Sequence, residues 1–253
     1  MPTKVKRAHV IRCALPLLAA LLGLSGCAAS QGLAREALQD EIRREESRFI
    51  DTPTAAADPV RPRAPQLRLY LKPTGFLHRE FEWTSRDRDV VLAWSKRVPF
   101  DTGEKSAGFL TLSSLKGHTL TELRAAATRY GVDWVLVFDG AAAVDRYNNY
   151  KAALWYWTIL GAYVADGTQS DVLCLLKATL WDVKTGARLF EEQTDAKIEK
   201  VGPAALVEDK TVLELAKATA LEALTRRLDT QLNRLHERTE TKFLLCKIRE
   251  IGF

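Results

Sequence analysis

Residues 119–138 constrain the fold of this chain more strongly than any other segment, because they join a capped helix directly to a buried strand. Thr119 and Glu122 have the spacing of a capping box. Gly131 follows at the position where a left-handed residue commonly ends a helix. Residues 132–138 are almost continuously apolar, as in a strand covered on both faces. One face of the expected helix carries Leu120, Leu123, Ala127 and Tyr130. This succession predicts a layered α/β or α+β domain.

The segments before this unit predict further elements of the same domain, which we place at 66–253. Alternating apolar and polar residues indicate half-buried strands, and a Ser or Thr before an apolar-periodic segment indicates a helix start. The expected elements are a strand at 67–71, a helix from Thr84 or Ser85 to about Arg97 that buries Val90, Val91 and Trp94, and a short strand within 108–115.

The segments after residue 170 predict a hairpin and a long helix. The expected elements are strands at 172–183 and 187–195 with Gly186 in the turn, a helix from about Val207 to Leu235 with an apolar stripe of leucines and alanines, and a final strand within 242–253. The predicted fold class is therefore α/β (α+β), with one small mixed sheet flanked by helices and the long C-terminal helix packed on that sheet.

The first 27 residues have the organisation of a bacterial lipoprotein signal. Residues 1–12 are basic, and residues 13–26 are uncharged and mostly apolar. The apolar stretch is well short of the roughly 20 residues that span a bilayer core, but it suits a signal peptide. It ends at Leu24-Ser25-Gly26-Cys27, which resembles a lipobox. We therefore predict cleavage between Gly26 and Cys27, removal of residues 1–26, and acylation of Cys27.

The basic character of the chain belongs mostly to this leader. The formal net charge is +5, and the leader carries Lys4, Lys6, Arg7 and Arg12 with no acid, so +1 remains for residues 27–253. A nearly neutral mature chain gives no electrostatic support to a nucleic-acid partner. We therefore expect no nucleic acid among its partners.

Residues 27–65 are predicted to be a lipidated cysteine followed by a flexible tether rich in Pro and Ala, within which 33–49 can form a charged helix. Residues 51–65 contain four prolines and few large apolar side chains, which favours an extended spacer. Ala28 and Ala29 follow Cys27. By resemblance to the sorting rules of enterobacterial lipoproteins, alanine at this position implies the outer membrane, with the domain on its periplasmic face.

An aromatic segment at 152–164 admits two interpretations. It is strongly apolar and contains Trp155, Tyr156, Trp157 and Tyr163. Most such segments are buried, so we favour a core strand or a strand and loop. The alternative is a surface that touches lipid or a partner protein.

Cys174 and Cys246 remain after the lipidated cysteine is set aside. An oxidising periplasm permits a disulfide between them. The alternative, which we favour slightly, is a buried Cys174 within the apolar run 172–176 and an unpaired Cys246.

The sequence contains no motif of a known catalytic or cofactor site. Glycine-rich phosphate loops, C-x-x-C pairs, zinc-protease helices and nucleophile elbows are all missing. The mature histidines, His78, His118 and His236, have no ligand spacing, and Asp133 and Asp139 fit ordinary turn chemistry at the ends of the strand. We expect no catalytic residue, no metal and no cofactor.

Three segments together resemble the rhombotarget lipoproteins, an uncharacterised bacterial family associated by genome context with rhombosortase systems. They are Leu123–Val137 with its Tyr130-Gly-Val-Asp133, Leu154 to Tyr163, and Ala178–Gly186. The resemblance covers roughly residues 66–235. The domain is also similar to that of the curli-secretion lipoprotein and of the lipoprotein activators of penicillin-binding proteins. The resemblance implies that this chain is an envelope lipoprotein, and it implies no catalytic residue.

The expected function is that of a lipid-anchored envelope protein whose non-catalytic domain binds a periplasmic partner, in secretion or surface display. A second hypothesis is an oligomeric or membrane-inserting, pore-like secretion component that uses residues 152–164. A third is an enzyme with a site that the sequence does not reveal.

Overall fold

The computed structural model describes residues 30, 32–50, 65–73, 81–100, 109–110, 119–155, 158 and 160–250, without the side chains of 153, 154, 161, 162 and 242–250. The chain divides into two compact units. Unit 1 comprises Met1–Gly32, Asp145–Asp171 and Glu199–Asp209, and unit 2 comprises Leu33–Val144, Val172–Ile198 and Lys210–Phe253. Each unit is described by itself.

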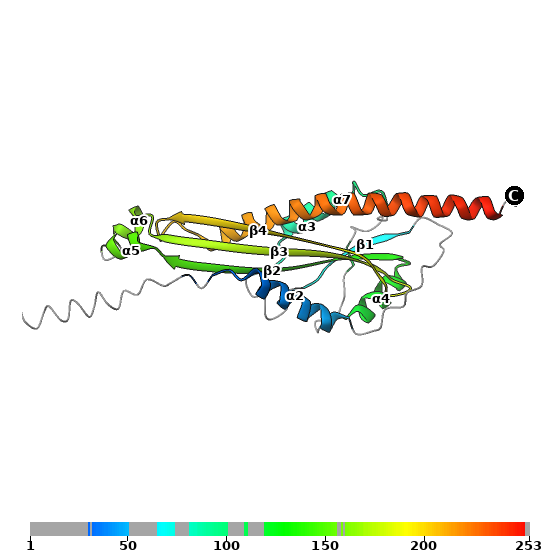
Figure 1. Ribbon diagram of the computed structural model, residues 1–253, viewed down its shortest axis with the longest axis horizontal. Coiled ribbons are helices and arrows are strands. Elements are labelled where there is room, and N and C mark those ends of the chain that lie inside the picture. Colours follow the sequence, from blue (N-terminus) through cyan, green and yellow to red (C-terminus); the bar gives the residue numbers. More distant parts are fainter. Residues whose placement is uncertain are drawn as a thin grey trace, which may run out of the picture. The chain divides into compact units, whose positions relative to one another are not determined.

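Four strands of the described residues form one sheet in the order β1-β2-β3-β4 (Figure 1). β1 runs parallel to β2, with Leu67 opposite Trp134 and Leu71 opposite Phe138. Hairpin connections then join β2 to β3 and β3 to β4, which makes the sheet mixed. In chain order the elements are α2 (Arg35–Phe49), β1 (Leu67–Leu71), α3 (Ser85–Ser95), α4 (Leu120–Arg129), β2 (Trp134–Asn148), α5 (Tyr150–Trp155), α6 (Gly161–Val164), β3 (Thr168–Asp182), β4 (Arg188–Gly202) and α7 (Asp209–Glu250).

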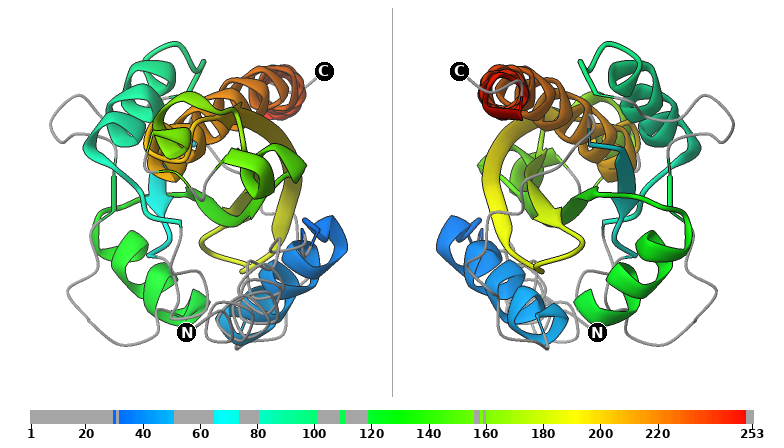
Figure 2. Two further views of the ribbon diagram at one scale, coloured as in Figure 1. Left: turned by 90° about the vertical axis from the view of Figure 1, so that its left-hand side faces the viewer. Right: turned by 90° about the vertical axis from the view of Figure 1, so that its right-hand side faces the viewer.

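In unit 2, helices cover both faces of the sheet (Figure 2). α3 and α7 lie on one face, over a cluster of buried strand residues that includes Leu67, Leu69, Leu136, Phe138, Leu176 and Leu180. α4 and α2 lie on the opposite face, where Val135, Val137 and Trp181 pack under α4 and Ala141, Leu173 and Leu175 pack under α2. Side chains on both faces of β2 and β3 are therefore buried, which is why the sequences of these strands are nearly continuous apolar runs. The architecture confirms the predicted α+β class and the packing of the long C-terminal helix on the sheet.

The local signals of helix starts and turns are also confirmed. Thr84 caps α3 through a capping box with Asp87, and Thr119 caps α4 through one with Glu122. Gly131 and Gly186 adopt φ values of 66° and 70°, in the left-handed region that glycine tolerates at no steric cost. The predicted burial of Val90 is wrong, because this residue is 45% exposed. Tyr130, at the end of the apolar face of α4, is 64% exposed. Of the predicted strand within 108–115, Phe109 forms an isolated bridge with Leu69, and 108 and 111–115 lie outside the described residues.

The central strand is longer than predicted. We expected a turn at Asp139 and Gly140, but β2 continues without interruption to Asn148. A Cβ atom added to Gly140 would come within 2.3 Å of the ring of Phe81. The glycine therefore allows close approach of a buried aromatic ring to the strand, and it does not form a turn.

The C-terminal segment is helical where we predicted a strand. α7 extends to Glu250 and includes residues 242–250 of the segment predicted as a final strand, whereas 251–253 lie outside the described residues. No glycine or proline stands between Leu235 and Glu250, so nothing in the sequence ends the helix where its apolar stripe ends.

Residues 33–50 belong to the folded domain and not to a flexible tether. α2 buries Leu38, Ile42, Glu45 and Phe49, which recur at helical spacing along one face. Leu38 and Ile42 pack against Ala141, Leu173 and Leu175 of the sheet. This corrects the tether boundaries of 27–65. The proline-containing part at 51–64 lies outside the described residues.

Candidate functional site

A network of buried ion pairs lies between α2 and the sheet in unit 2. Lys72, just after β1, places Nζ 2.7 Å from Oδ2 of Asp139 in β2 and 3.3 Å from Oε2 of Glu45 in α2. The side chains of these three residues are only 9–14% exposed. The ammonium group also lies 5.9 Å from the centre of the Phe49 ring. Asp139, which we predicted to be a turn residue, is therefore a structural anion.

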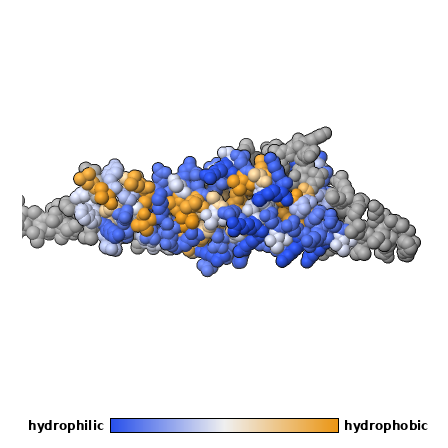
Figure 3. Space-filling view, turned by 90° about the horizontal axis from the view of Figure 1, so that it is seen from above, coloured by the Kyte–Doolittle hydropathy of each residue, from blue (hydrophilic) through white to orange (hydrophobic). Residues whose placement is uncertain are grey.

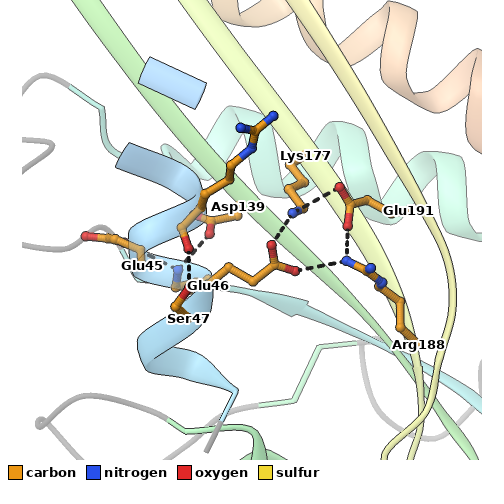
Figure 4. A network of polar contacts seen from close by, with 9 residues as sticks. Glu45, Glu46, Ser47, Asp139, Lys177, Arg188 and Glu191 are labelled. Carbon is orange, nitrogen blue, oxygen red and sulfur yellow. Dashed lines mark hydrogen bonds and ion pairs between the residues drawn. The ribbon is translucent and has the colours of Figure 1, made fainter. Parts of the chain in front are cut away.

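A second buried lysine extends the network across the sheet (Figure 4). Lys177 of β3, with 6% of its side chain exposed, lies 2.6 Å from Oε2 of Glu46 and 3.1 Å from Oε1 of Glu191 in β4. Arg188 closes the network, because its Nη1 lies 3.5 Å from Glu46 and 2.5 Å from Glu191. Each of the four carboxylates of this group contacts at least one of its three cations.

The network is suited to fixing the position of α2. Buried charges must be paired to offset their desolvation, so loss of one partner leaves an uncompensated buried charge. Glu45 and Glu46, which are adjacent in α2, reach Lys72 and Lys177 respectively. Such an arrangement favours one rotation and one register of α2 on the sheet.

A small cavity beside this network has space for about one water molecule. Its volume is ≈ 20 Å³, about that of a single bound water. It is lined by Glu46, Phe49, Lys72, Val137, Asp139, Lys177, Thr179 and Trp181. A cavity of this size does not accommodate a cofactor or an organic substrate. In the part of the chain that the structure describes, no three His, Cys, Asp or Glu side chains are grouped in a way that could hold a metal ion.

The opposite face of the sheet in unit 2 holds a third buried lysine. Lys217 of α7 places Nζ 2.6 Å from Oδ2 of Asp87 and donates a 2.7 Å hydrogen bond to the carbonyl oxygen of Glu82. Its ammonium group lies 5.4 Å from the centre of the Phe81 ring. The same carboxylate accepts from the backbone N–H of Thr84 at the start of α3. Lys217 therefore links α7 to the N-terminus of α3.

Cys174 is a free, completely buried thiol on this face. Burial raises its pKa to about 12, and the charge of Lys217 opposes that shift. The thiol is therefore neutral and inaccessible, as expected of a structural cysteine. Because Cys174 is free in the structure, no disulfide joins it to Cys246, whose side chain is not among the described ones. The alternative of a buried, unpaired Cys174 agrees with the structure.

Unit 1 exposes apolar side chains between β2 and β3. Trp155 and Tyr163 are 58% and 59% exposed, and Leu160 and Val164 are 75% and 77% exposed. Apolar side chains are visible among polar ones on the surface at the end that carries α5 and α6 (Figure 3). The favoured interpretation of this segment as core is wrong for Trp155 and Tyr163. Tyr156 and Trp157 lie outside the described residues, as do Gly26 and Cys27.

The loop that carries these side chains is closed at its base. The backbone N–H of Asn149 donates to the carbonyl oxygen of Gly167 at 2.8 Å, and its side chain donates to Asp166. Asn148 accepts a 3.0 Å hydrogen bond from the hydroxyl of Thr168. We call residues 149–167 the α5–α6 loop. Among the described residues, no helix is both long and apolar enough to cross a membrane.

Of the three mature histidines, His236 alone lies among the described residues. His236 of α7 places Nε2 3.3 Å from Glu240 and packs against the ring of Phe100. His78 and His118 lie outside the described residues.

The ion pairs of the buried lysines were not predicted from the sequence. Lys177 interrupts an apolar run in a strand predicted to be buried, and a charged residue at such a position implies a buried partner of opposite charge. That signal was available, but it did not identify Glu46. The glutamate lies 131 positions away in a helix that we had placed in the tether.

Comparisons with known proteins find only weak similarity. No family model matches the chain, and no curated protein matches it. A solved structure of a candidate lipoprotein from Caulobacter crescentus is 18% identical over 45% of this chain and 81% of its own length, with a TM-score of 0.26. The protein CT253 from Chlamydia trachomatis is 9% identical over 67% and 98%, with a TM-score of 0.30. The lipoprotein GNA1162 from Neisseria meningitidis is 12% identical over 63% and 98%, with a TM-score of 0.28. Similarity of this extent identifies neither a family nor a shared function.

Proposed function

We propose that this chain is a lipid-anchored protein of the cell envelope whose domain binds a periplasmic protein partner without catalysis, in secretion or surface display. One observation carries the anchor: a basic segment, an uncharged apolar segment and Leu24-Ser25-Gly26-Cys27 follow one another in the order that export and lipidation require. Two or more acyl chains make a stable membrane anchor, where one is marginal. The outer membrane is the location we propose, from the alanines after Cys27.

The charged side chains of unit 2 support a binding role over an enzymatic one. Lys72 and Lys177 are the most deeply buried cations of the network, and each is held by two carboxylates. A general acid or base needs room for a substrate beside it, and the cavity here has space for about one water. These groups hold α2 in place, and the domain presents its outer surface to a partner.

The test of the anchor compares two cysteine substitutions in the same leader. We expect Cys27→Ala to abolish the acyl mass on the N-terminal peptide and to release the protein from the membrane fraction. Cys13→Ala is the matched control, because Cys13 is removed with the leader, and its product should keep the acyl mass. Identical mass spectra and fractionation for the two variants would contradict lipidation at Cys27.

The test of the binding role uses the anchored protein in cells. Chemical crosslinking followed by mass spectrometry should recover the same envelope protein from independent preparations. The Cys27→Ala variant should lose that crosslink, because the unanchored domain is no longer concentrated at the membrane. Crosslinks that are equally abundant with and without the anchor would contradict a partner engaged at the membrane.

The second hypothesis, a membrane-inserting or oligomeric component that uses residues 152–164, gains one specific observation. Trp155 and Tyr163 are exposed, and exposed apolar patches of this kind are characteristic of interaction surfaces.

A further inference from the structure

The exposed apolar side chains of the α5–α6 loop stand in a segment without charge. Residues 152–165 contain no Asp, Glu, Lys or Arg. Within this segment, more than half of the surface of each of four apolar residues is exposed, namely Trp155, Leu160, Tyr163 and Val164. Leu206, in the connection from β4 to α7 of the same unit, is 62% exposed. Leaving so much apolar surface in water is unfavourable at about 25 cal/mol per Å², so a covering environment is expected.

Hydrogen bonds hold the loop that carries these side chains in a defined conformation. The hydrogen bonds of Asn149 to Gly167 and Asp166 fix its two ends. Within the loop, Asn149 also caps α5, because its side-chain oxygen accepts from the backbone N–H of Lys151 at 2.9 Å. The connection that carries Leu206 is held within unit 1 as well, since Arg146 binds the carbonyl oxygen of Ala204 at 3.0 Å.

The same unit holds the chain just after the predicted lipidation site. The hydroxyl of Ser30 donates to Oδ2 of Asp145 at 2.5 Å, and the backbone N–H of Gly32 donates to the same oxygen at 3.0 Å. Ser30 follows Cys27 by three residues, which span at most about 10 Å of extended chain. Acyl chains on Cys27 would therefore bring unit 1 to the membrane surface.

We infer that the α5–α6 loop rests in the headgroup layer of the membrane that holds the acyl chains, with Trp155, Leu160 and Tyr163 in contact with lipid. The inference rests on the proposed lipidation of Cys27. Trp and Tyr favour the interface between water and hydrocarbon, where one part of the ring is apolar and another is polar. α5 has six residues and α6 has four, about 9 Å and 6 Å of helix against a hydrocarbon core of about 30 Å. The loop therefore lies in the interface and does not span the bilayer.

The absence of charge in residues 152–165 makes the contact apolar rather than electrostatic. Anionic lipid is not needed, and salt should have little effect. Raising the ionic strength from about 0.1 M to about 1 M shortens the screening length from about 10 Å to about 3 Å, which weakens a polybasic contact but not an apolar one.

The test places a fluorescent label in the loop of the lipidated mature protein. The Tyr163→Cys variant, made together with Cys246→Ser, is labelled with an environment-sensitive dye and reconstituted in vesicles of phosphatidylethanolamine and phosphatidylglycerol. The matched control is Tyr130→Cys in the same background, since Tyr130 is a similarly exposed tyrosine of unit 2. Cys174 is buried with a raised pKa and does not compete for the label. Vesicles with and without doxyl-labelled phospholipid are compared, at low and high salt.

We expect doxyl lipid to quench the label at position 163 at both salt concentrations and to leave the label at position 130 unchanged. Equal emission at position 163 with and without doxyl lipid, in protein that carries its acyl mass and floats with the vesicles, overturns the inference but not the proposed anchor. Disulfide crosslinking of the unlabelled Tyr163→Cys protein to a second copy, together with unquenched emission from the labelled protein, also overturns it, because a second copy would then cover the loop. Protein that lacks the acyl mass and does not float refutes the proposed lipidation itself.

Discussion

Replacement of Ile42 by alanine tests whether α2 belongs to the folded domain. Ile42 is 2% exposed and packs with Leu38, Leu173 and Leu175. The substitution removes three buried carbon atoms, worth about 2.4 kcal/mol at about 0.8 kcal/mol each. The cavity left behind adds to this, since buried Ile→Ala changes cost about 2–5 kcal/mol. We expect a loss of about 3 kcal/mol in the free energy of unfolding.

The assay is urea unfolding of the mature chain with Cys27→Ser, which keeps the protein free of lipid. The matched control is Arg44→Ala on the exposed side of the same helix, which should stay within about 0.5 kcal/mol of the parent. A loss of about 3 kcal/mol corresponds to a melting temperature lower by about 6–12 °C for a domain of this size. If the Ile42→Ala and Arg44→Ala variants unfold at the same urea concentration, α2 is not packed on the sheet and the corrected boundary is wrong.

Three further substitutions test the interior. We expect Gly140→Ala to lower the free energy of unfolding by about 1–3 kcal/mol, because the added methyl group would clash with the ring of Phe81. In urea unfolding, the loss should be smaller when Phe81→Leu is also present. If Gly140→Ala leaves the free energy of unfolding unchanged, the position has open space or forms a turn. Lys217→Met should lower the free energy of unfolding by about 3 kcal/mol, because it leaves the carboxylate of Asp87, which is 13% exposed, without its cation. An unchanged midpoint in urea unfolding would show that the ion pair is not formed. The pKa of Cys174 is raised from 9.0 to about 12 by burial, so the stability that depends on it is fully present below pH 9 and is lost as pH rises toward 12, at up to about 1.4 kcal/mol per pH unit. Cys174→Ala should therefore flatten the alkaline decline in a comparison of unfolding at pH 8 and pH 10.5, and parallel pH profiles of variant and parent would contradict the burial of this thiol.

The elements that sequence analysis located correctly are those determined by neighbouring residues. The capping boxes at Thr84 and Thr119 each satisfy backbone N–H groups within three positions, so their geometry is readable without the fold. Gly131 and Gly186 likewise adopt the positive φ that the helix end and the turn require, and glycine is the residue that does so at no steric cost. The apolar run 132–138 indicated burial on both faces because only a strand between two layers needs it.

The features that escaped prediction depend on residues far apart in the sequence. Gly140 was interpreted through its neighbour Asp139 as a turn, but its role is to make room for Phe81, 59 positions earlier. α2 was assigned to the tether because it is rich in charge, although Leu38, Ile42 and Phe49 already had the spacing of a docking face. The charges themselves were misleading, since Glu45 and Glu46 are partners of buried lysines and not a solvated surface.

The exposed aromatic residues show a different limit of sequence reasoning. An apolar run predicts removal from water, but it does not say whether protein or lipid replaces the water. Trp155 and Tyr163 were placed in the core on the general frequency of burial, whereas the structure exposes them. The charge-free composition of 152–165 is compatible with either environment, and the structure adds that Trp155 and Tyr163 are not covered by this chain.

The docking of α2 changes what kind of partner the proposed anchor allows. With a tether through residue 65, a lipid on Cys27 would let the domain reach partners far from the membrane. α2 begins at Arg35, eight residues after Cys27, and eight extended residues span at most about 28 Å. The distance between Cys27 and the domain would grow only if α2 detached from the sheet. The buried face of α2 and its ion pairs to Lys72 and Lys177 oppose that detachment. A periplasmic partner that binds beside the start of α2 should therefore lie close to the membrane, as a second anchored protein or the periplasmic face of an integral one does. Substitutions that release α2, such as Ile42→Ala combined with loss of Lys177, would lengthen the connection and should shift crosslinks toward partners farther from the membrane.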